Sequence, residues 1–196
     1  DAREQAPAAA HRDMYLDEQG KVNRDLAVNG PLAGGIPGEV AGLEHLARNY
    51  GRLPLAQSLQ PAIRLAREGF PVDEKYHAMM GWRIDVIKRW PAAAEVLLKD
   101  GENPPVGHVI KLPDLAWVLE NVAERGAEGF YHGPVAERLV EGVRGAGGIW
   151  TLEDLAAYRV KERDPIRTAY GDYELVTAPP PSSGGVAIAE ILNVLE

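Results

Sequence analysis

Residues 179–185 read Pro-Pro-Pro-Ser-Ser-Gly-Gly and constrain the fold of this 196-residue chain more than any other stretch. Proline fixes φ and lacks an amide donor, so any regular element that precedes residues 179–181 must end there. Ser182 and Ser183 are favourable residues at a helix N-terminus, and Gly184 and Gly185 permit unusual dihedrals or close packing. The segment therefore predicts the end of a strand, a turn and the start of a helix.

The residues after this turn predict a largely buried helix, because Ile188, Ile191, Leu192 and Leu195 recur at helical spacing with few charges between them. Two interpretations of the Ser-Ser-Gly-Gly turn stay open. Small residues can let a helix begin close to a strand, or amides at the helix start can face an anionic ligand. The turn is neither a phosphate-binding loop nor a nucleophile elbow, because the Gly-Lys-Ser/Thr and Gly-x-Ser-x-Gly patterns are absent.

Glycine and proline divide the rest of the chain into short elements. Apolar periodicity predicts a helical part over about 39–157, and a strand–strand–helix part follows over about 165–196. We expect one long helix over 73–89 and a hairpin-like or irregular surface connection over 17–29. Residues 1–10 resemble the end of a strand. The predicted class is α+β, mainly helical with a few strands near both ends, in a single partial domain over 1–196.

Composition excludes several classes of function. A net charge of −8 without a basic run argues against nucleic acid or an anionic membrane surface as a partner. The chain has no cysteine, so disulfides and thiol catalysis are excluded. The five histidines are far apart in sequence and form no metal-binding motif, so we expect neither a metal nor a cofactor.

No complete active site is visible in the residues. The only serines are Ser58, Ser182 and Ser183, and no signature supplies any of them with a base. Thr151-Leu-Glu-Asp154 predicts an N-cap with an acidic residue three positions on, a variant capping box that starts a short helix. The acidic pair Glu153-Asp154 is otherwise explained by the dipole at the start of that helix. Because the chain opens on what resembles a strand end and stops within an apolar helix, we expect it to be a piece of a longer polypeptide.

Arg3 is the one candidate binding residue near the N-terminus. A guanidinium held on a rigid segment can clamp a carboxylate through two parallel hydrogen bonds, which lysine cannot reproduce. The alternative is an ion pair with Glu4 or another acidic residue. Similarly, Gly34-Gly-Ile-Pro-Gly38 could cradle an anion, although packing at a helix start is the commoner explanation.

Several segments together, in one order along nearly the whole chain, resemble the gamma-glutamyltransferase (gamma-glutamyl transpeptidase, glutathione hydrolase) family. They are Asp1-Ala-Arg-Glu-Gln-Ala-Pro7, Gly35-Ile-Pro-Gly-Glu-Val-Ala-Gly-Leu43, Tyr50-Gly-Arg-Leu-Pro-Leu55, Gln60–Phe70, Phe130-Tyr-His-Gly133, Gly147–Tyr158, Pro179–Gly185 and Ile191–Glu196.

The resemblance implies an N-terminal nucleophile hydrolase with a four-layer αββα core, made as a precursor that cleaves itself into a large and a small subunit. This chain is similar to the middle of the large subunit. The catalytic threonine would then lie in the small subunit, its partner, and the substrates would be gamma-glutamyl small molecules. A periplasmic or extracellular location is implied by the family alone.

Residue by residue, Arg3 matches the family arginine that holds the substrate α-carboxylate. Ser182, Ser183, Gly184 and Gly185 do not match the family's oxyanion-hole serines, and we interpret them as a structural turn near the site. Two departures are visible: Gln5 replaces the commoner threonine, and the glycine-rich segment normally upstream of Arg3 is absent.

Two other functions stay open. One is a relative with different acyl specificity, such as a cephalosporin acylase or an enzyme that processes poly-gamma-glutamate. The other is a non-catalytic helical interaction module, stable alone or paired with another chain. The apolar C-terminal helix distinguishes a fragment from such a module, because a fragment without its small subunit should expose a large apolar patch and favour association.

Overall fold

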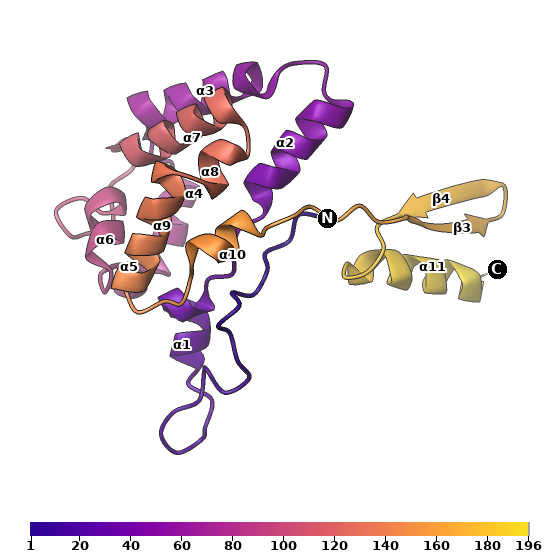
Figure 1. Ribbon diagram of the computed structural model, residues 1–196, viewed down its shortest axis with the longest axis horizontal. Coiled ribbons are helices and arrows are strands. Elements are labelled where there is room, and N and C mark those ends of the chain that lie inside the picture. The colour runs from indigo at the N-terminus through magenta and orange to yellow at the C-terminus, as the bar shows by residue number, and fades with distance from the viewer. Residues whose placement is uncertain (196) are drawn as a thin grey trace. The chain divides into compact units, whose positions relative to one another are not determined.

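The computed structural model of the protein describes residues 1–195 and divides into two compact units (Figure 1). The larger unit is Ala2–Arg159, and the smaller is Asp1 with Val160–Glu196. The two are described separately below.

The larger unit begins with an extended segment, where the sequence predicted the end of a strand. Its regular pairing is a single antiparallel bridge between Gln5 and Ile36, followed by a second bridge between Leu16 and Val22. The connection over 17–29 was predicted to be hairpin-like or irregular. The Leu16–Val22 bridge fits a hairpin-like turn, but the connection also contains the helix α1 (Arg24–Asn29), which was not predicted. The side chain of Asn23 explains this helix, because it accepts hydrogen bonds from the amides of Asp25 and Leu26. A short 3-10 helix, η1 (Pro31–Ala33), follows.

Six helices surround the core of this unit. They are α2 (Glu39–Tyr50), α3 (Leu55–Glu68), α7 (Pro113–Arg125), α8 (Glu128–Tyr131), α9 (Pro134–Gly145) and α10 (Leu152–Ala156). The first five begin or end at a glycine or proline or within two residues of one, whereas α10 begins after its Thr151 cap. Helix α3 packs along α7 and continues through Pro61. The buried side chains of these helices include Ile63, Val122, Val135 and Leu155.

The single helix predicted over 73–89 is wrong. The structure contains α4 (Glu74–Gly81) and α5 (Ile84–Ile87), and α4 ends in a tighter turn because the Trp82 amide also bonds to the carbonyl of Met79. Pro91 does not merely close this region, since it opens α6 (Pro91–Leu97). Two short strands, β1 (Phe70–Pro71) and β2 (Val109–Ile110), pair antiparallel.

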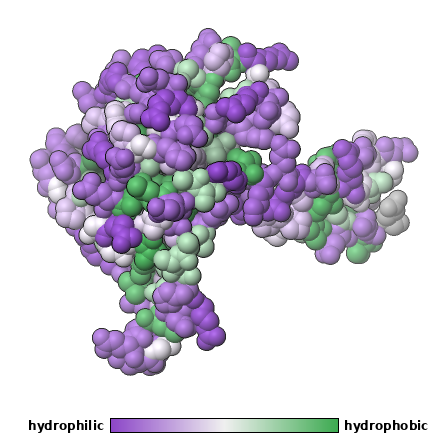
Figure 2. All heavy atoms as spheres, in the orientation of Figure 1, coloured by the Kyte–Doolittle hydropathy of each residue, from purple (hydrophilic) through white to green (hydrophobic). Residues whose placement is uncertain are grey.

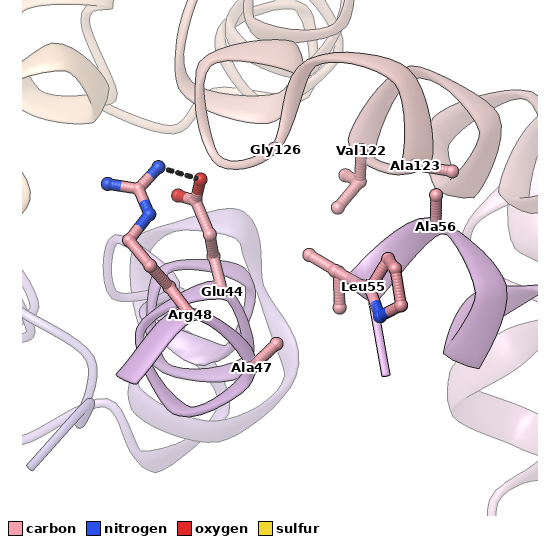
Figure 3. Close-up of a pocket in the computed structure, with 9 residues that line it drawn as sticks. Glu44, Ala47, Arg48, Leu55, Ala56, Val122, Ala123 and Gly126 are labelled. Atoms are coloured by element: carbon pink, nitrogen blue, oxygen red, sulfur yellow. Dashed lines mark hydrogen bonds and ion pairs between the residues drawn. The ribbon is translucent and has the colours of Figure 1, made fainter. Parts of the chain in front are cut away.

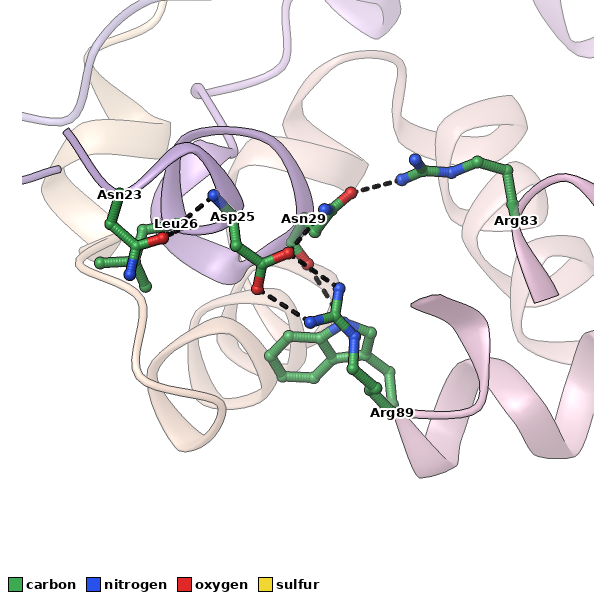
Figure 4. Close-up of polar contacts among 7 residues, drawn as sticks. Asn23, Asp25, Leu26, Asn29, Arg83 and Arg89 are labelled. Atoms are coloured by element: carbon green, nitrogen blue, oxygen red, sulfur yellow. Dashed lines mark hydrogen bonds and ion pairs between the residues drawn. The ribbon is translucent and has the colours of Figure 1, made fainter. Parts of the chain in front are cut away.

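A polar cluster joins α1 to the segment between α5 and α6 (Figure 4). Both terminal nitrogens of Arg89 donate to Asp25, at 2.8 and 3.1 Å, and Arg83 donates to the Asn29 side chain at 2.6 Å. Hydrogen bonds from Arg89 and Asn29 hold the pKa of the Asp25 carboxyl below its usual range. The indole nitrogen of Trp90 completes the cluster by donating to the Asn29 carbonyl. This contact network fixes α1 and thereby the chain that leads into η1.

The smaller unit contains a hairpin and one helix. Strands β3 (Ile166–Tyr170) and β4 (Tyr173–Thr177) pair antiparallel around Gly171, and α11 (Ser183–Leu195) lies against β3. The strands, the turn and the helix are as the sequence predicted.

The predicted burial of α11 is wrong in this structure. Ile188, Ile191, Val194 and Leu195 are 45–84% exposed, and Gly185 is the buried residue of this helix. Within its own unit the helix has only a two-stranded hairpin to pack on, which is too small to cover its apolar residues. Figure 2 shows hydrophobic residues, in green, at the surface of this unit.

Helix α10 offers a matched test of the core. Leu155 is fully buried, whereas Leu152 on the same helix is 42% exposed. We expect Leu155→Ala to lower the free energy of unfolding by about 2–5 kcal/mol, because it leaves a cavity, and Leu152→Ala to lower it by about 1 kcal/mol or less. Urea unfolding of both variants checks this, and equal losses would contradict the placement of Leu155 in the core.

Candidate functional site

Arg3 lies on the extended segment Ala2–Ala8, with its side chain exposed. Although no regular strand supports it, the backbone of this segment is held at three places. The Gln5 amide donates to the Ile36 carbonyl at 3.0 Å, and the Ile36 amide donates to the Gln5 carbonyl at 2.7 Å. Beyond this pair, the Ala8 amide donates to Asp154 Oδ1 at 2.8 Å. The third attachment is at Arg3 itself, where Tyr158 Oη donates to the carbonyl at 2.7 Å.

Asp154 serves two structures at once. One carboxylate oxygen holds Ala8, and the other accepts from the Thr151 amide and hydroxyl in a capping box at the start of α10. The Thr151 hydroxyl in turn accepts from the Asp154 amide. The sequence predicted the cap. It did not predict the bond from Ala8 to Asp154.

Two tyrosines stack beside the segment. The rings of Tyr131 and Tyr158 are 5.5 Å apart with an angle of 6° between their planes. Tyr131 Oη donates to the Pro37 carbonyl at 2.7 Å and accepts from the Ala41 amide. Burial raises the pKa of Tyr131 to about 12, and burial followed by the nearby charge of Glu4 raises the pKa of Tyr158. Both phenols therefore stay protonated, and able to donate, at neutral pH.

The glycines of 34–38 pack against this same segment. A Cβ on Gly35 would press on the side chain of Glu4 and on the Gln5 carbonyl, and a Cβ on Gly38 would overlap Tyr158 Oη and the Ala2 carbonyl. These contacts support packing, rather than an anion cradle, as the reason for the glycines.

The turn at 182–185 lies in the smaller unit. The Ser182 amide donates to the Pro179 carbonyl at 3.1 Å, and α11 begins at Ser183. Gly185 is buried where a Cβ would overlap the Ala178 carbonyl, while Gly184 faces open space. Close packing of the helix start on the end of β4 therefore accounts for Gly185.

A hollow of about 270 Å³ lies between α2, the start of α3 and the end of α7 (Figure 3). Its charged groups are already engaged, because Glu44 accepts from Arg48 at 2.8 Å and from the Ala127 amide at 3.0 Å. The other lining residues are mainly apolar, among them Leu55 and Val122. The hollow is best explained as a gap between three helices. The contacts of Glu44 with Arg48 and Ala127 lie at its edge.

Across residues 1–195 no polar or charged residue is buried, and no three histidine or acidic side chains lie together as metal ligands. Over the same residues, no helix combines the length and the apolar character needed to cross a membrane. The exposed hydroxyl of Ser58 donates to the Pro54 carbonyl of its own helix. Arg3, the binding residue proposed from the sequence, is exposed and lies on the anchored segment.

A sequence model described as gamma-glutamyltranspeptidase matches residues 1–196, the whole chain. The chain belongs to the gamma-glutamyltranspeptidase family. It is 41% identical over 197 residues to a glutathione hydrolase proenzyme of Escherichia coli, covering all of this chain and 34% of that relative. The chain thus spans about a third of the length of the curated relatives it matches.

Several solved structures are similar to it, among them the two that follow. The gamma-glutamyltranspeptidase of Helicobacter pylori has a TM-score of 0.95 at 37% identity, over 100% of this chain and 56% of that one. A cephalosporin acylase from Bacillus halodurans has a TM-score of 0.81 at 30% identity, over 99% of this chain and 37% of that one. The predicted resemblance and the predicted mainly helical α+β class are both confirmed.

Sequence reasoning proposed Arg3 as a binding residue but did not predict the groups that hold its backbone. Tyr131 and Tyr158 occur inside two of the family-like segments. The glycines at 35 and 38 were a signal of close backbone approach, but only Gly38 lies against a tyrosine, Tyr158.

The raised pKa of Tyr131 predicts a specific loss of stability in alkali. An unfolded tyrosine ionises near pH 10, whereas folded Tyr131 keeps its proton to about 12. Tyr131 therefore contributes its full stabilisation below about pH 10 and loses it as the pH rises toward about 12.

Tyr131→Phe should be less stable than wild type by about 1 kcal/mol at pH 8, since it loses the bond to Pro37, and this difference should shrink above pH 10. Urea unfolding at several pH values measures it. A difference that stays constant to pH 11.5 would show that Tyr131 titrates normally.

Proposed function

We propose that this chain is part of the large subunit of a proenzyme that cleaves gamma-glutamyl amides such as glutathione. In this proposal a precursor cuts itself, and the threonine freed at the new N-terminus attacks the gamma-glutamyl carbonyl. The glutamyl group then passes from the acyl-enzyme to water, an amino acid or a peptide. That threonine lies outside residues 1–196, so the chain alone is inactive.

The family membership of the whole chain and its coverage of 34% of a relative named a proenzyme support this division into subunits. The partner of this chain is then the small subunit of the same precursor. For location we propose the periplasm or the cell exterior, on family grounds alone.

Arg3 is the observation that carries the proposed substrate contact. Its side chain is exposed, while hydrogen bonds at its own carbonyl, at Gln5 and at Ala8 hold the backbone on both sides. A guanidinium on a fixed backbone can meet a carboxylate in a bidentate pair, and the α-carboxylate of a gamma-glutamyl donor supplies that group. We propose that Ser182, Ser183, Gly184 and Gly185 shape a turn near the site and contact no reacting atom.

A second candidate is a relative with different acyl specificity, because the chain is also similar to a cephalosporin acylase at 30% identity. The two functions differ in what the donor must carry. A gamma-glutamyl enzyme requires the α-carboxylate, so it should turn over gamma-glutamyl-p-nitroanilide much faster than the matching anilide that lacks this group. Equal turnover of both donors would favour the second candidate.

The test of Arg3 is the substitution Arg3→Lys in the complete proenzyme. Lysine keeps the charge and loses the two parallel hydrogen bonds, so KM for gamma-glutamyl-p-nitroanilide should rise roughly tenfold or more, with kcat less affected. Self-cleavage should proceed normally, because the clamp acts on substrate. An unchanged KM would remove Arg3 from the site, and failed cleavage would indicate a structural role instead.

A further inference from the structure

Tyr158 is the side chain that contacts the backbone of Arg3 directly. It follows the last turn of α10, is 4% exposed, and points its hydroxyl at the Arg3 carbonyl, 2.7 Å away. The other two attachments of the segment, at Gln5 and Ala8, lie two and five residues further along. The bond from Tyr158 is thus the attachment closest to the guanidinium.

The surroundings leave the phenol little freedom. Its ring lies flat against Tyr131, whose own hydroxyl is bonded to the carbonyl of Pro37. Gly38 lies directly against Tyr158 Oη and the Ala2 carbonyl, so that a Cβ at this position would overlap both. At Gly42, one turn further along α2, a Cβ would meet the Cβ of Ala2 at 2.6 Å. The start of α2 and the Tyr131–Tyr158 pair together form a closely fitted support for residues 2 and 3.

We propose that Tyr158 is a positioning residue for substrate binding, which fixes the Arg3 backbone so that the guanidinium meets the α-carboxylate of the donor. This inference rests on the proposed role of Arg3. The bond from Tyr158 limits where the Cα of Arg3 can lie, and a fixed Cα limits the positions in which the guanidinium can meet a carboxylate. Tyr158 itself touches no substrate in this account and acts only through Arg3.

The test removes one oxygen atom. Tyr158→Phe in the complete proenzyme keeps the ring and its stacking but loses the hydrogen bond to Arg3. We expect KM for gamma-glutamyl-p-nitroanilide to rise roughly three- to tenfold, as the loss of one buried hydrogen bond allows, with kcat within about twofold of wild type. Tyr15→Phe is the matched control, because the Tyr15 hydroxyl also donates to a backbone carbonyl, that of Leu32 at 3.0 Å. This control should leave KM unchanged.

A second variant reaches the same contact from the opposite side. Gly38→Ala places a methyl group between Tyr158 Oη and the Ala2 carbonyl, and the backbone there has φ −111°, which alanine tolerates. It should raise KM like Tyr158→Phe. Gly142→Ala, in α9 with open space around its Cα, is the control for a glycine-to-alanine change in this unit.

Combining Tyr158→Phe with Arg3→Lys shows whether Tyr158 positions Arg3 or has a general structural role. If Tyr158 acts through Arg3, Tyr158→Phe should add less than about twofold to the KM of Arg3→Lys. Tyr158→Phe should also leave KM nearly unchanged for a donor whose α-carboxylate is converted to an amide.

A full additional rise in KM in the Arg3→Lys background would overturn the inference, and so would an unchanged KM in Tyr158→Phe beside a raised KM in Arg3→Lys. An Arg3→Lys enzyme with wild-type KM would instead refute the clamp itself, and the positioning role with it.

Discussion

The hydrogen bonds that hold Ala2–Ala8 against the larger unit are the constraint on which the candidate site depends. An extended segment outside any sheet has no ladder to fix it, so each of its backbone groups needs a partner elsewhere. Here the carbonyl of Arg3 accepts from Tyr158, Gln5 exchanges two bonds with Ile36, and the amide of Ala8 donates to Asp154. Two separate parts of the unit, the segment before α2 and α10 with the residues just after it, therefore meet at a stretch of six residues.

The short helices of the larger unit carry the residues that contact this segment. Helix α10 supplies both Asp154, in its first turn, and Tyr158, just past its end, and fully buried Leu155 between them fixes the helix to the core. Helix α8 supplies Tyr131, whose ring stacks on the ring of Tyr158. The glycines before and within α2 remove the side chains that would otherwise keep the segment away. Packing of the core therefore fixes the helices whose side chains hold the backbone of the exposed Arg3.

Local rules predicted much of this fold. Pro113, Gly126 and Thr151 mark helix ends in the sequence and do so in the structure, and the hairpin around Gly171 follows from its alternating residues. The single helix over 73–89 failed because α4 ends at Gly81 and the Trp82 amide bonds to the Met79 carbonyl, a turn that apolar periodicity does not reveal. Arg3 was proposed through the family resemblance, whereas the contacts of Tyr158 and Asp154 with its segment were not predicted. Their roles come from contacts across about 150 residues of sequence, and a hydrogen bond of that kind leaves no local pattern.

Amide hydrogen exchange can test whether hydrogen bonds hold the segment that carries Arg3 against the larger unit. If the segment is held as described, the amides of Gln5 and Ala8 exchange as slowly as those of the helices around them, because their release requires opening of the larger unit. The amide of Ile36, which bonds back to Gln5, should show the same protection. Exchange of Gln5 and Ala8 at the rate of an unfolded peptide would contradict the account, since Arg3 would then lie on a loose tail that no tyrosine could position.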